Sequence, residues 1–308
     1  MAPLKENNRL QSIRWKLIIA VTLLGATIWI SATVLNLTAV VTAMTALPTQ
    51  TALVITLLGA ASWLLRGLRT WMLFDQLPLS EALGLSFLHN TANNLAPMRL
   101  GELALPILAR WLAGVEFSIG LTSLLWIRLL DFISLIGISL CIILLPVAGT
   151  IMLALLAALI FLTPLLLGFI VPKTQHIQLP EILAKARAQL IYEAQNGKRL
   201  HRMWRLTILS WLSKIMGMGV LLATLSGIPM TEVVTTILGA ELSSILPIHG
   251  FAGAGSYEAG GVLGSAFMGL SPVVALEMTI QLHIYVLSLT AVFGILGALL
   301  LLKRTIDG

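Results

Sequence analysis

The chain has 308 residues, of which 58 % are hydrophobic and 10 % are charged, and its formal net charge is +6. About a quarter of the residues in soluble domains are charged, so this composition excludes an ordinary soluble protein. The apolar runs are as long as membrane helices, which excludes an outer-membrane barrel of short alternating segments. Neither a basic face nor a motif indicates a nucleic-acid partner. The single cysteine, Cys141, excludes an intrachain disulfide.

The first half of the chain starts with a basic tail, residues 1–16, followed by an apolar run at 17–35. We interpret this run as a retained membrane span, because no small-residue cleavage site of a signal peptide follows it. A second span is predicted at 49–68. The next apolar stretch, 82–111, is interrupted by polar and backbone-breaking residues at 93–102. Each half of this stretch is shorter than the roughly 20 residues that a span needs, so a re-entrant helical hairpin is predicted.

The remaining spans are predicted from uninterrupted apolar runs at 118–145, 151–171, 206–225 and 273–302. Residues 172–205 form a long polar segment whose apolar residues recur on one face of a helix. This pattern is typical of a helix that lies on the membrane surface, although a plain linker between two halves explains it equally well. A second interrupted region, 231–268, again combines a proline, several glycines and a glutamate.

Several short motifs recur about 150 residues later in the chain, which indicates an internal repeat. Ser62-Trp63 with Arg66 recurs as Ser210-Trp211 with Lys214, and Leu77 to Glu81 recurs as Ile228 to Glu232. Leu95 to Arg99 recurs as Ile245 to His249 and, more weakly, Trp126 to Arg128 recurs as Thr279 to Gln281. We expect an all-α polytopic membrane protein with a single transmembrane domain, 1–308. Its parts are the N-terminal tail and first span (1–48), repeat 1 (49–171), a cytoplasmic amphipathic linker (172–205) and repeat 2 (206–302).

The distribution of basic residues predicts the orientation in the membrane. Lys and Arg residues favour the cytoplasmic side, which places the N-terminus, Arg66 and Arg69, the 172–205 segment and the C-terminus there. The first hairpin then enters from the cytoplasm and the second from the outer side. Two similar halves of opposite orientation form an inverted-topology repeat, the arrangement of many secondary transporters. Hairpins that cross the membrane fully would give the same orientation of the spans, so both forms stay open.

Four charged residues in the predicted spans of the first half are candidates for binding a substrate. Arg66 and Arg69 are three residues apart and share a helix face. We expect Arg69 to anchor the helix by reaching lipid phosphates, and the deeper Arg66 to be the better ligand. Arg128 and Asp131 lie midway along an apolar span, where an unpaired charge is costly, so a mutual pair is expected. A structural pair and a substrate-binding pair fit equally well.

The two interrupted regions hold the other candidates. In the first, Arg99 and Glu102 flank a glycine where exposed helix-end amides can hold an anion, and Asn93 and Asn94 precede them.

In the second half, His249 replaces Arg99, Gln281 replaces Arg128, and Glu258 follows His249 across a glycine-rich bend. Because histidine titrates near neutral pH, a His249–Glu258 pair could switch with pH. The alternative is that His249 only hydrogen-bonds a backbone carbonyl. We interpret His283 and Glu277 as interior polar groups.

Four sequence elements together resemble the lysylphosphatidylglycerol synthase transmembrane family. They are Arg66 to Trp71, Pro97-x-Arg99-x-Gly101-Glu102, Arg128-x-x-Asp131, and Pro247 with a glycine-rich run to Glu258. This family includes the flippase domain of MprF proteins and stand-alone homologues, and we expect a stand-alone member without the synthase domain. The resemblance implies a protein that moves phospholipids or lipid-linked head groups between leaflets.

The resulting expectation is a lipid transporter or flippase of the inner membrane rather than an enzyme. Arg66, Arg99 and Arg128 would receive the lipid phosphate, and Glu102, Asp131 and Glu258 would pair with arginines or with a head-group amine. No cofactor or metal is expected, because the sequence contains neither a nucleotide-binding loop nor a metal-ligand cluster. A membrane-embedded lipid-modifying transferase and a non-transporting accessory protein are the alternatives. Homo-oligomerisation stays open.

The orientation can be tested with single cysteines in a Cys141→Ser background. A cysteine at Asn196 is expected to be labelled from the cytoplasm, and cysteines at Gly149 and Gly227 from the outer side, because basic residues stay inside. The measurement is labelling of intact cells with an impermeant maleimide. Labelling of Asn196 from outside would overturn the orientation and, with it, the inverted repeat.

Overall fold

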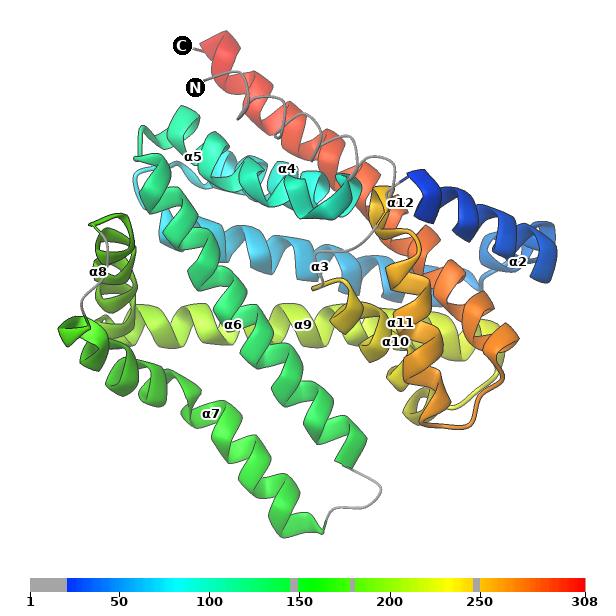
Figure 1. Ribbon diagram of the computed structural model, residues 1–308. Coiled ribbons are helices and arrows are strands. Elements are labelled where there is room, and N and C mark those ends of the chain that lie inside the picture. The colour runs from blue at the N-terminus through cyan, green and yellow to red at the C-terminus, as the bar shows by residue number, and fades with distance from the viewer. Residues whose placement is uncertain (1–20, 145–148, 178–180, 246–249, 308) are drawn as a thin grey trace, which may run out of the picture. The chain divides into compact units, whose positions relative to one another are not determined.

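The computed structural model describes residues 21–144, 149–177, 181–245 and 250–307, and every regular element in these ranges is helical. A helix at Val21–Val34 comes first. The further elements, in chain order, are α2 (Leu37–Thr45), α3 (Thr49–Leu73), α4 (Leu79–Leu95), η1 (Pro97–Leu103), α5 (Ala104–Ala113), α6 (Phe117–Leu144), α7 (Thr150–Lys173), η2 (Thr174–His176), α8 (Glu181–Gln195), α9 (Gly197–Ser226), α10 (Met230–Ser243), η3 (Phe251–Gly253), α11 (Ser256–Ala266) and α12 (Pro272–Asp307) (Figure 1).

Several of these helices are long enough to span a membrane. In the described ranges, four helices are long and apolar enough to span a bilayer: Thr49–Leu73, Phe117–Leu144, Gly197–Ser226 and Pro272–Leu302. Two bent helix pairs, Val21–Val34 with Leu37–Thr45 and Thr150–Ile160 with Leu162–His176, raise this number to six if each pair counts as one span. The all-helical membrane fold is therefore confirmed. The largest difference in a helix boundary is at α9, which begins at Gly197, within the segment predicted as a linker.

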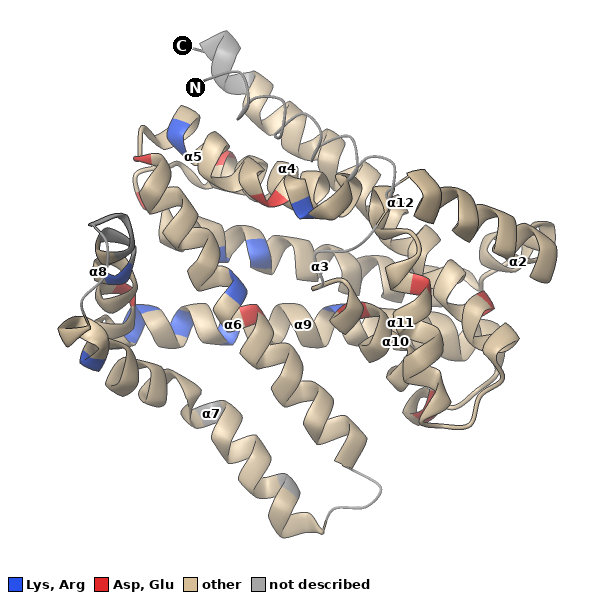
Figure 2. Cartoon of the chain, in the orientation of Figure 1, with Lys and Arg blue, Asp and Glu red and all other residues tan. Residues whose placement is uncertain are grey.

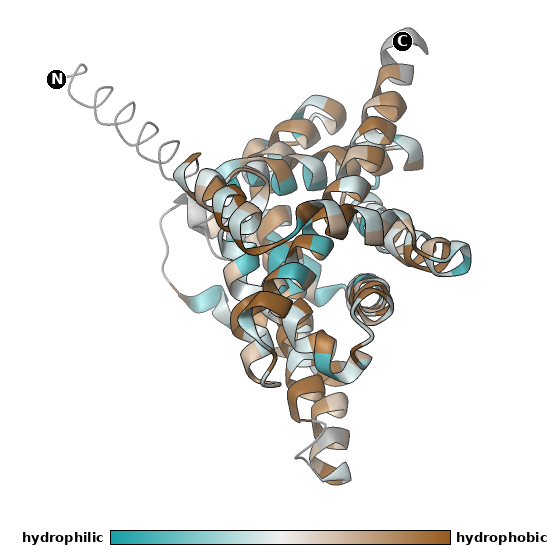
Figure 3. Ribbon diagram, turned by 90° about the vertical axis from the view of Figure 1, so that its right-hand side faces the viewer, coloured by the Kyte–Doolittle hydropathy of each residue, from teal (hydrophilic) through white to brown (hydrophobic). Residues whose placement is uncertain are grey.

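Apolar side chains on α7 face outward rather than into a protein core. Ile151 and Leu155 are 77 % and 66 % exposed, and Leu165 and Phe169 are also exposed. Large exposed apolar surfaces are unfavourable in water, whereas lipid chains can cover them. Brown, hydrophobic positions recur along the helices in Figure 3, and the exposed apolar side chains of α7 are those expected of a helix in contact with lipid.

A proline bends α7, and a tryptophan compensates for the bond that this proline removes. Pro164 has no N–H, so it cannot donate to the carbonyl of Ile160, four residues earlier. The helix bends by 51° at this point. The indole Nε1–H of Trp204 on α9 donates to the Ile160 oxygen at 3.0 Å. This tertiary hydrogen bond joins α7 to α9 and satisfies a carbonyl that the sequence alone would leave unpaired.

The described chain forms two compact units, each of which combines segments that are distant in sequence. Unit 1 comprises the described parts of Met1–Leu58, Asn90–Gly101 and Ile215–Val292, and unit 2 those of Gly59–His89, Glu102–Lys214 and Phe293–Gly308. In unit 2, α6 and α7 diverge as two arms, and α8 packs against both (Figure 1). Leu105, Trp126 and Leu130 lie in its core.

In unit 1, glycines let helices approach one another closely. α10 and α11 pack side by side, and a Cβ atom at Gly239 would lie 2.2 Å from the Gly260 carbonyl oxygen. Gly260 and Gly264 are four residues apart on α11, the spacing typical of close helix pairs in membranes. In the first interrupted region, a Cβ atom at Gly101 would lie 2.0 Å from the Ala92 carbonyl oxygen. Larger residues are therefore excluded from both contacts.

The link between α7 and α9 predicts the effect of Trp204→Phe. This change keeps an aromatic ring but removes the donor to Ile160, leaving a partly buried carbonyl unsatisfied at a cost of about 1–3 kcal/mol. Thermal unfolding in detergent should show the loss, whereas Trp111→Phe, at a residue 61 % exposed, should be neutral. Adding Pro164→Ala supplies a helical N–H to Ile160 and should recover part of the loss. Equal stability of Trp204→Phe and wild type would exclude this role.

Candidate functional site

An ion pair between α3 and α6 lies in the interior of unit 2. Arg69 donates from Nη1 to Asp131 Oδ1 at 2.6 Å and from Nη2 to Oδ2 at 3.2 Å. The two side chains are 4 % and 6 % exposed. The expectation that Arg69 reaches out to lipid phosphates is therefore wrong. Its guanidinium is buried because a bidentate carboxylate on a neighbouring helix offsets the cost of desolvation.

Helix α9 completes the surroundings of this pair. The Thr207 hydroxyl accepts a hydrogen bond from Arg69 Nη1 at 2.9 Å, and the Trp211 indole donates to Asp131 Oδ1 at 3.2 Å. These two residues are four apart and therefore share one face of the helix. Sequence analysis used Trp211 only as part of a repeated motif and did not identify Thr207 as a site residue.

A second ion pair, between Glu102 and Arg128, adjoins the first. Arg128 donates to Glu102 Oε2 from Nε at 2.9 Å and from Nη2 at 2.7 Å. Its Nη1 lies 3.6 Å from Asp131 Oδ2, so the predicted Arg128–Asp131 pair is present. This distance is longer than those of the Arg128–Glu102 and Arg69–Asp131 pairs. Arg128 is 26 % exposed, the largest fraction among these four charged side chains. We call Arg69, Glu102, Arg128 and Asp131 the charge cluster.

Three further residues adjoin the charge cluster. His89 on α4 is buried, and its Nε2 lies 3.9 Å from Glu102 Oε2. The Arg66 guanidinium lies 5.1 Å from the centre of the Trp211 ring, and the Lys214 ammonium lies 5.4 Å from it, which are cation–π distances. Figure 2 shows the basic residues on α3, α6 and α9 that take part. The sequence did not indicate His89, because a lone histidine in an apolar helix gives no signal.

Apart from Glu102, the candidate residues of the first interrupted region lie in unit 1. Asn94 Nδ2 donates to the Thr290 hydroxyl on α12 at 2.8 Å, and Asn93 is its partly buried neighbour on α4. Arg99 has a positive φ of 57° and donates from Nη1 to the carbonyls of Ser244 and Ile245 at 3.1 and 2.6 Å. It therefore caps the C-terminus of α10, where the helix dipole favours a cation.

In the second interrupted region, Glu258 contacts a histidine that was not predicted as its partner. His249 lies outside the described residues, so the His249–Glu258 pair stays a prediction. Glu258 on α11 contacts His283 on α12, with Oε1 and Nδ1 2.5 Å apart, and it accepts a bond from the Gly255 N–H at 2.8 Å. His283 Nε2 lies 2.6 Å from the Ala252 carbonyl. Because both ring nitrogens face acceptors, the doubly protonated ring satisfies both contacts.

Gln281, predicted as the counterpart of Arg128, is buried on α12 in unit 1. Its Nε2 lies 3.4 Å from Glu277 Oε1, one turn earlier on the same helix. The candidate residues are thus divided between the units. Arg66 and the charge cluster belong to unit 2, whereas Asn93, Asn94, Arg99, Glu258 and Gln281 belong to unit 1. In the described ranges, no group of three or more His, Cys, Asp and Glu side chains could hold a metal ion.

The buried Arg69–Asp131 pair predicts a sharp contrast between two variants. Asp131→Asn leaves a buried guanidinium without its anion and should cost about 3–5 kcal/mol of stability. Replacing both residues, as Arg69→Met with Asp131→Leu, should recover most of that loss because no charge stays buried. The measurements are thermal unfolding and size-exclusion chromatography of the purified variants. A single variant as stable as the double one would mean that the pair is not structural.

Comparison with known proteins agrees with this membrane architecture. A family model described as "Lysylphosphatidylglycerol synthase TM region" matches residues 15–297, a range that includes both ion pairs and both interrupted regions. No curated protein and no solved structure matches the chain. Because the family model covers most of the sequence, the chain belongs to the lysylphosphatidylglycerol synthase transmembrane family.

Proposed function

We propose that this protein moves a phosphate-bearing lipid between the leaflets of the inner membrane and that the charge cluster binds the lipid head group. The family connects the chain with membrane lipids and the cell envelope. The observation that carries the proposal is the partly exposed ion pair between Arg128, on the membrane-length helix α6, and Glu102, on the 3₁₀ segment η1. Charges at membrane depth are costly and most often serve a substrate pathway.

The chemistry of Arg128 suits a phosphodiester. Its Nε and Nη2 donors both point to one carboxylate oxygen of Glu102, and the same fork can hold two oxygens of a phosphate. A phosphodiester carries one negative charge, as the carboxylate does, so it can take the place of Glu102 at the Arg128 donors. Arg69 and Asp131 hold each other and keep the neighbouring helices in position during this exchange.

Glu102 then has a second group within reach. Its Oε2 lies 3.9 Å from His89 Nε2, so a small movement of the carboxylate away from Arg128 would form a hydrogen bond to a protonated nitrogen. Glu102 or Asp131 could also receive an amine carried by the head group. The acyl chains would stay in the bilayer, because the outer surfaces of the helices are apolar.

The inverted-repeat architecture belongs to the same proposal. Both interrupted regions consist of two short helices separated by a 3₁₀ segment that contains non-glycine residues with positive φ: Met98 and Arg99 in the first, and Ala252 in the second. These breaks lie about 150 residues apart, as do the repeated sequence motifs. This parallel supports two related halves that use broken helices for alternating access, with both termini in the cytoplasm.

Flipping by Arg128 variants tests the proposal. Arg128→Gln removes the charged fork, and because hydrogen bonds to charged groups contribute about 1.5–3 kcal/mol, flipping should fall by roughly 10- to 100-fold. Arg128→Lys keeps the charge but not the fork and should retain part of the activity. The assay follows fluorescent phosphatidylglycerol in proteoliposomes, using a membrane-impermeant reductant.

The matched control is Arg110→Gln, at an exposed arginine in the last turn of α5, which should flip lipid at the wild-type rate. Each variant must first elute as a single species from size-exclusion chromatography. Wild-type flipping by well-folded Arg128→Gln protein would remove this residue from the site. Formation of a new lipid product by the wild type would favour a transferase instead.

A further inference from the structure

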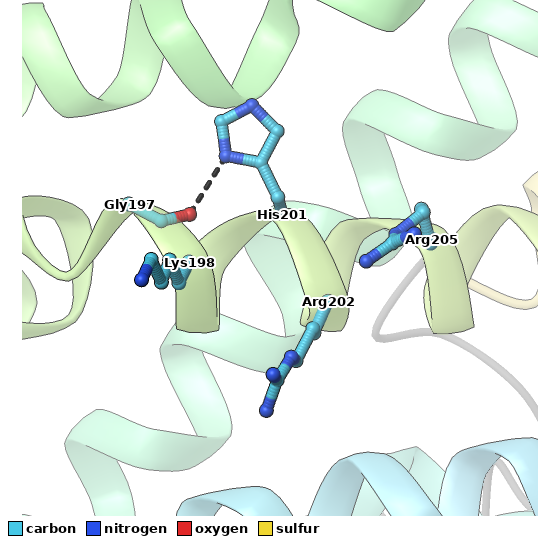
Figure 4. Close-up of a pocket in the computed structure, with 5 residues that line it drawn as sticks. All are labelled: Gly197, Lys198, His201, Arg202 and Arg205. Carbon is cyan, nitrogen blue, oxygen red and sulfur yellow. Dashed lines mark hydrogen bonds between the residues drawn. The ribbon is translucent and has the colours of Figure 1, made fainter.

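The first turns of α9 carry an exposed row of cations. Lys198, Arg202 and Arg205 are four and three residues apart, so they lie on one side of the helix, and all three are exposed. Together with Gly197 and His201 they line a pocket of about 420 Å³ (Figure 4). None of these five described residues is acidic. The His201 ring contacts the backbone of its own helix, with its Nδ1 2.7 Å from the Gly197 carbonyl oxygen (Figure 4).

Arg199, on the same helix, differs from the three row cations in that it contacts carboxylates of the protein. Arg199 faces the protein, where its Nε lies 3.3 Å from Glu193 Oε2 and its Nη1 4.0 Å from Asp75 Oδ2. Among the residues that the structure describes, no carboxylate lies within 4.0 Å of a row cation. Arg199 therefore joins α9 to its neighbours, whereas the three row cations are exposed.

The same side of α9 changes from cationic to apolar along the helix. Continuing the spacing of the row leads to Leu209 and Leu212, which are 50 % and 47 % exposed. The helix runs without a break from Gly197 to Ser226. At about 1.5 Å per residue, the row covers roughly 10 Å of the axis immediately before this apolar stretch, which corresponds to the head-group layer beside the hydrocarbon core.

We propose that the cation row is a lipid-binding site for the phosphate of an anionic phospholipid, in the leaflet where α9 begins. The head group would occupy the pocket, and the acyl chains would lie along Leu209 and Leu212. This apolar continuation favours a lipid over a soluble anion or a nucleic acid, neither of which would cover exposed leucines. The absence of a carboxylate among the five described lining residues disfavours zwitterionic lipids, because their ammonium group finds no partner there.

This site is separate from the charge cluster. Arg205 and Thr207 are two residues apart and so point in nearly opposite directions from the helix axis, and Thr207 faces Arg69. One face of α9 therefore contacts the charge cluster, while the opposite face would bind an anionic lipid at the periphery of the protein. The inference does not depend on the flipping activity and would hold for a protein of any function.

Binding of defined lipids to the purified full-length chain tests the inference. Dioleoyl phosphatidylglycerol and dioleoyl phosphatidylcholine are titrated separately into the detergent-solubilised protein, and bound lipid is counted by native mass spectrometry. A basic residue near an anionic lipid surface contributes about fivefold to affinity, so Arg202→Gln with Arg205→Gln should weaken phosphatidylglycerol binding by roughly 25-fold. Phosphatidylcholine binding should not change. Repeating the titrations in an Arg128→Gln background removes any lipid held at the charge cluster.

The control variant, Arg110→Gln with Lys173→Gln, loses the same two charges at exposed positions elsewhere in unit 2. It should bind phosphatidylglycerol as the wild type does. Equal weakening by both double variants would mean that net charge alone attracts the lipid and would overturn the site. Unchanged binding in the row variant would do the same, as would displacement of phosphatidylglycerol by millimolar inorganic phosphate, which would indicate a soluble anion instead.

Discussion

The bidentate pair of Arg69 and Asp131 is the interaction on which the described arrangement of unit 2 depends. Two full charges lie on membrane-length helices and are almost completely buried, and each satisfies the other while Thr207 and Trp211 supply further hydrogen bonds. This geometry fixes how α3, α6 and α9 are rotated about their axes. A turn of α3 or α6 would leave a charge unpaired in an apolar surrounding, and a turn of α9 would remove the hydrogen bonds of Thr207 and Trp211. The packing of the three helices and the position of Arg128 follow from it.

The two neighbouring ion pairs differ in exposure and in the kind of segment that supplies the carboxylate. Arg69 and Asp131 are closed to solvent and lipid, whereas Arg128 is partly exposed and pairs with a carboxylate from a short irregular segment, η1. A rigid pair beside an accessible one is what an anion-binding site needs, because the first preserves the geometry while the second exchanges its partner. In this interpretation, Glu102 occupies the place of a substrate oxygen until the lipid arrives.

The interrupted regions have a more structural role than their composition indicates. Arg99 donates to the last carbonyls of α10, and Glu258 holds His283 and the turn at Gly255. Both contacts satisfy backbone or side-chain groups at helix ends that a membrane would otherwise leave without partners. The broken helices are therefore stabilised by the same charged residues that the sequence suggests as ligands, and any role in transport would have to exchange these contacts for substrate.

The sequence by itself determined the class of protein, the positions of most spans, the two interruptions and the family, because these depend on composition, on run length and on local motifs. It also indicated that Arg128 and Asp131 are near each other, since three residues separate them on one helix. Only the tertiary structure decided that Asp131 pairs most closely with Arg69 on another helix, and that Arg128 pairs with Glu102. It also brought Trp204 to the carbonyl that Pro164 leaves free. The physical reason is that contacts between helices depend on their rotation and crossing, and residues 26 to 62 positions apart in one chain carry no local signal of that geometry.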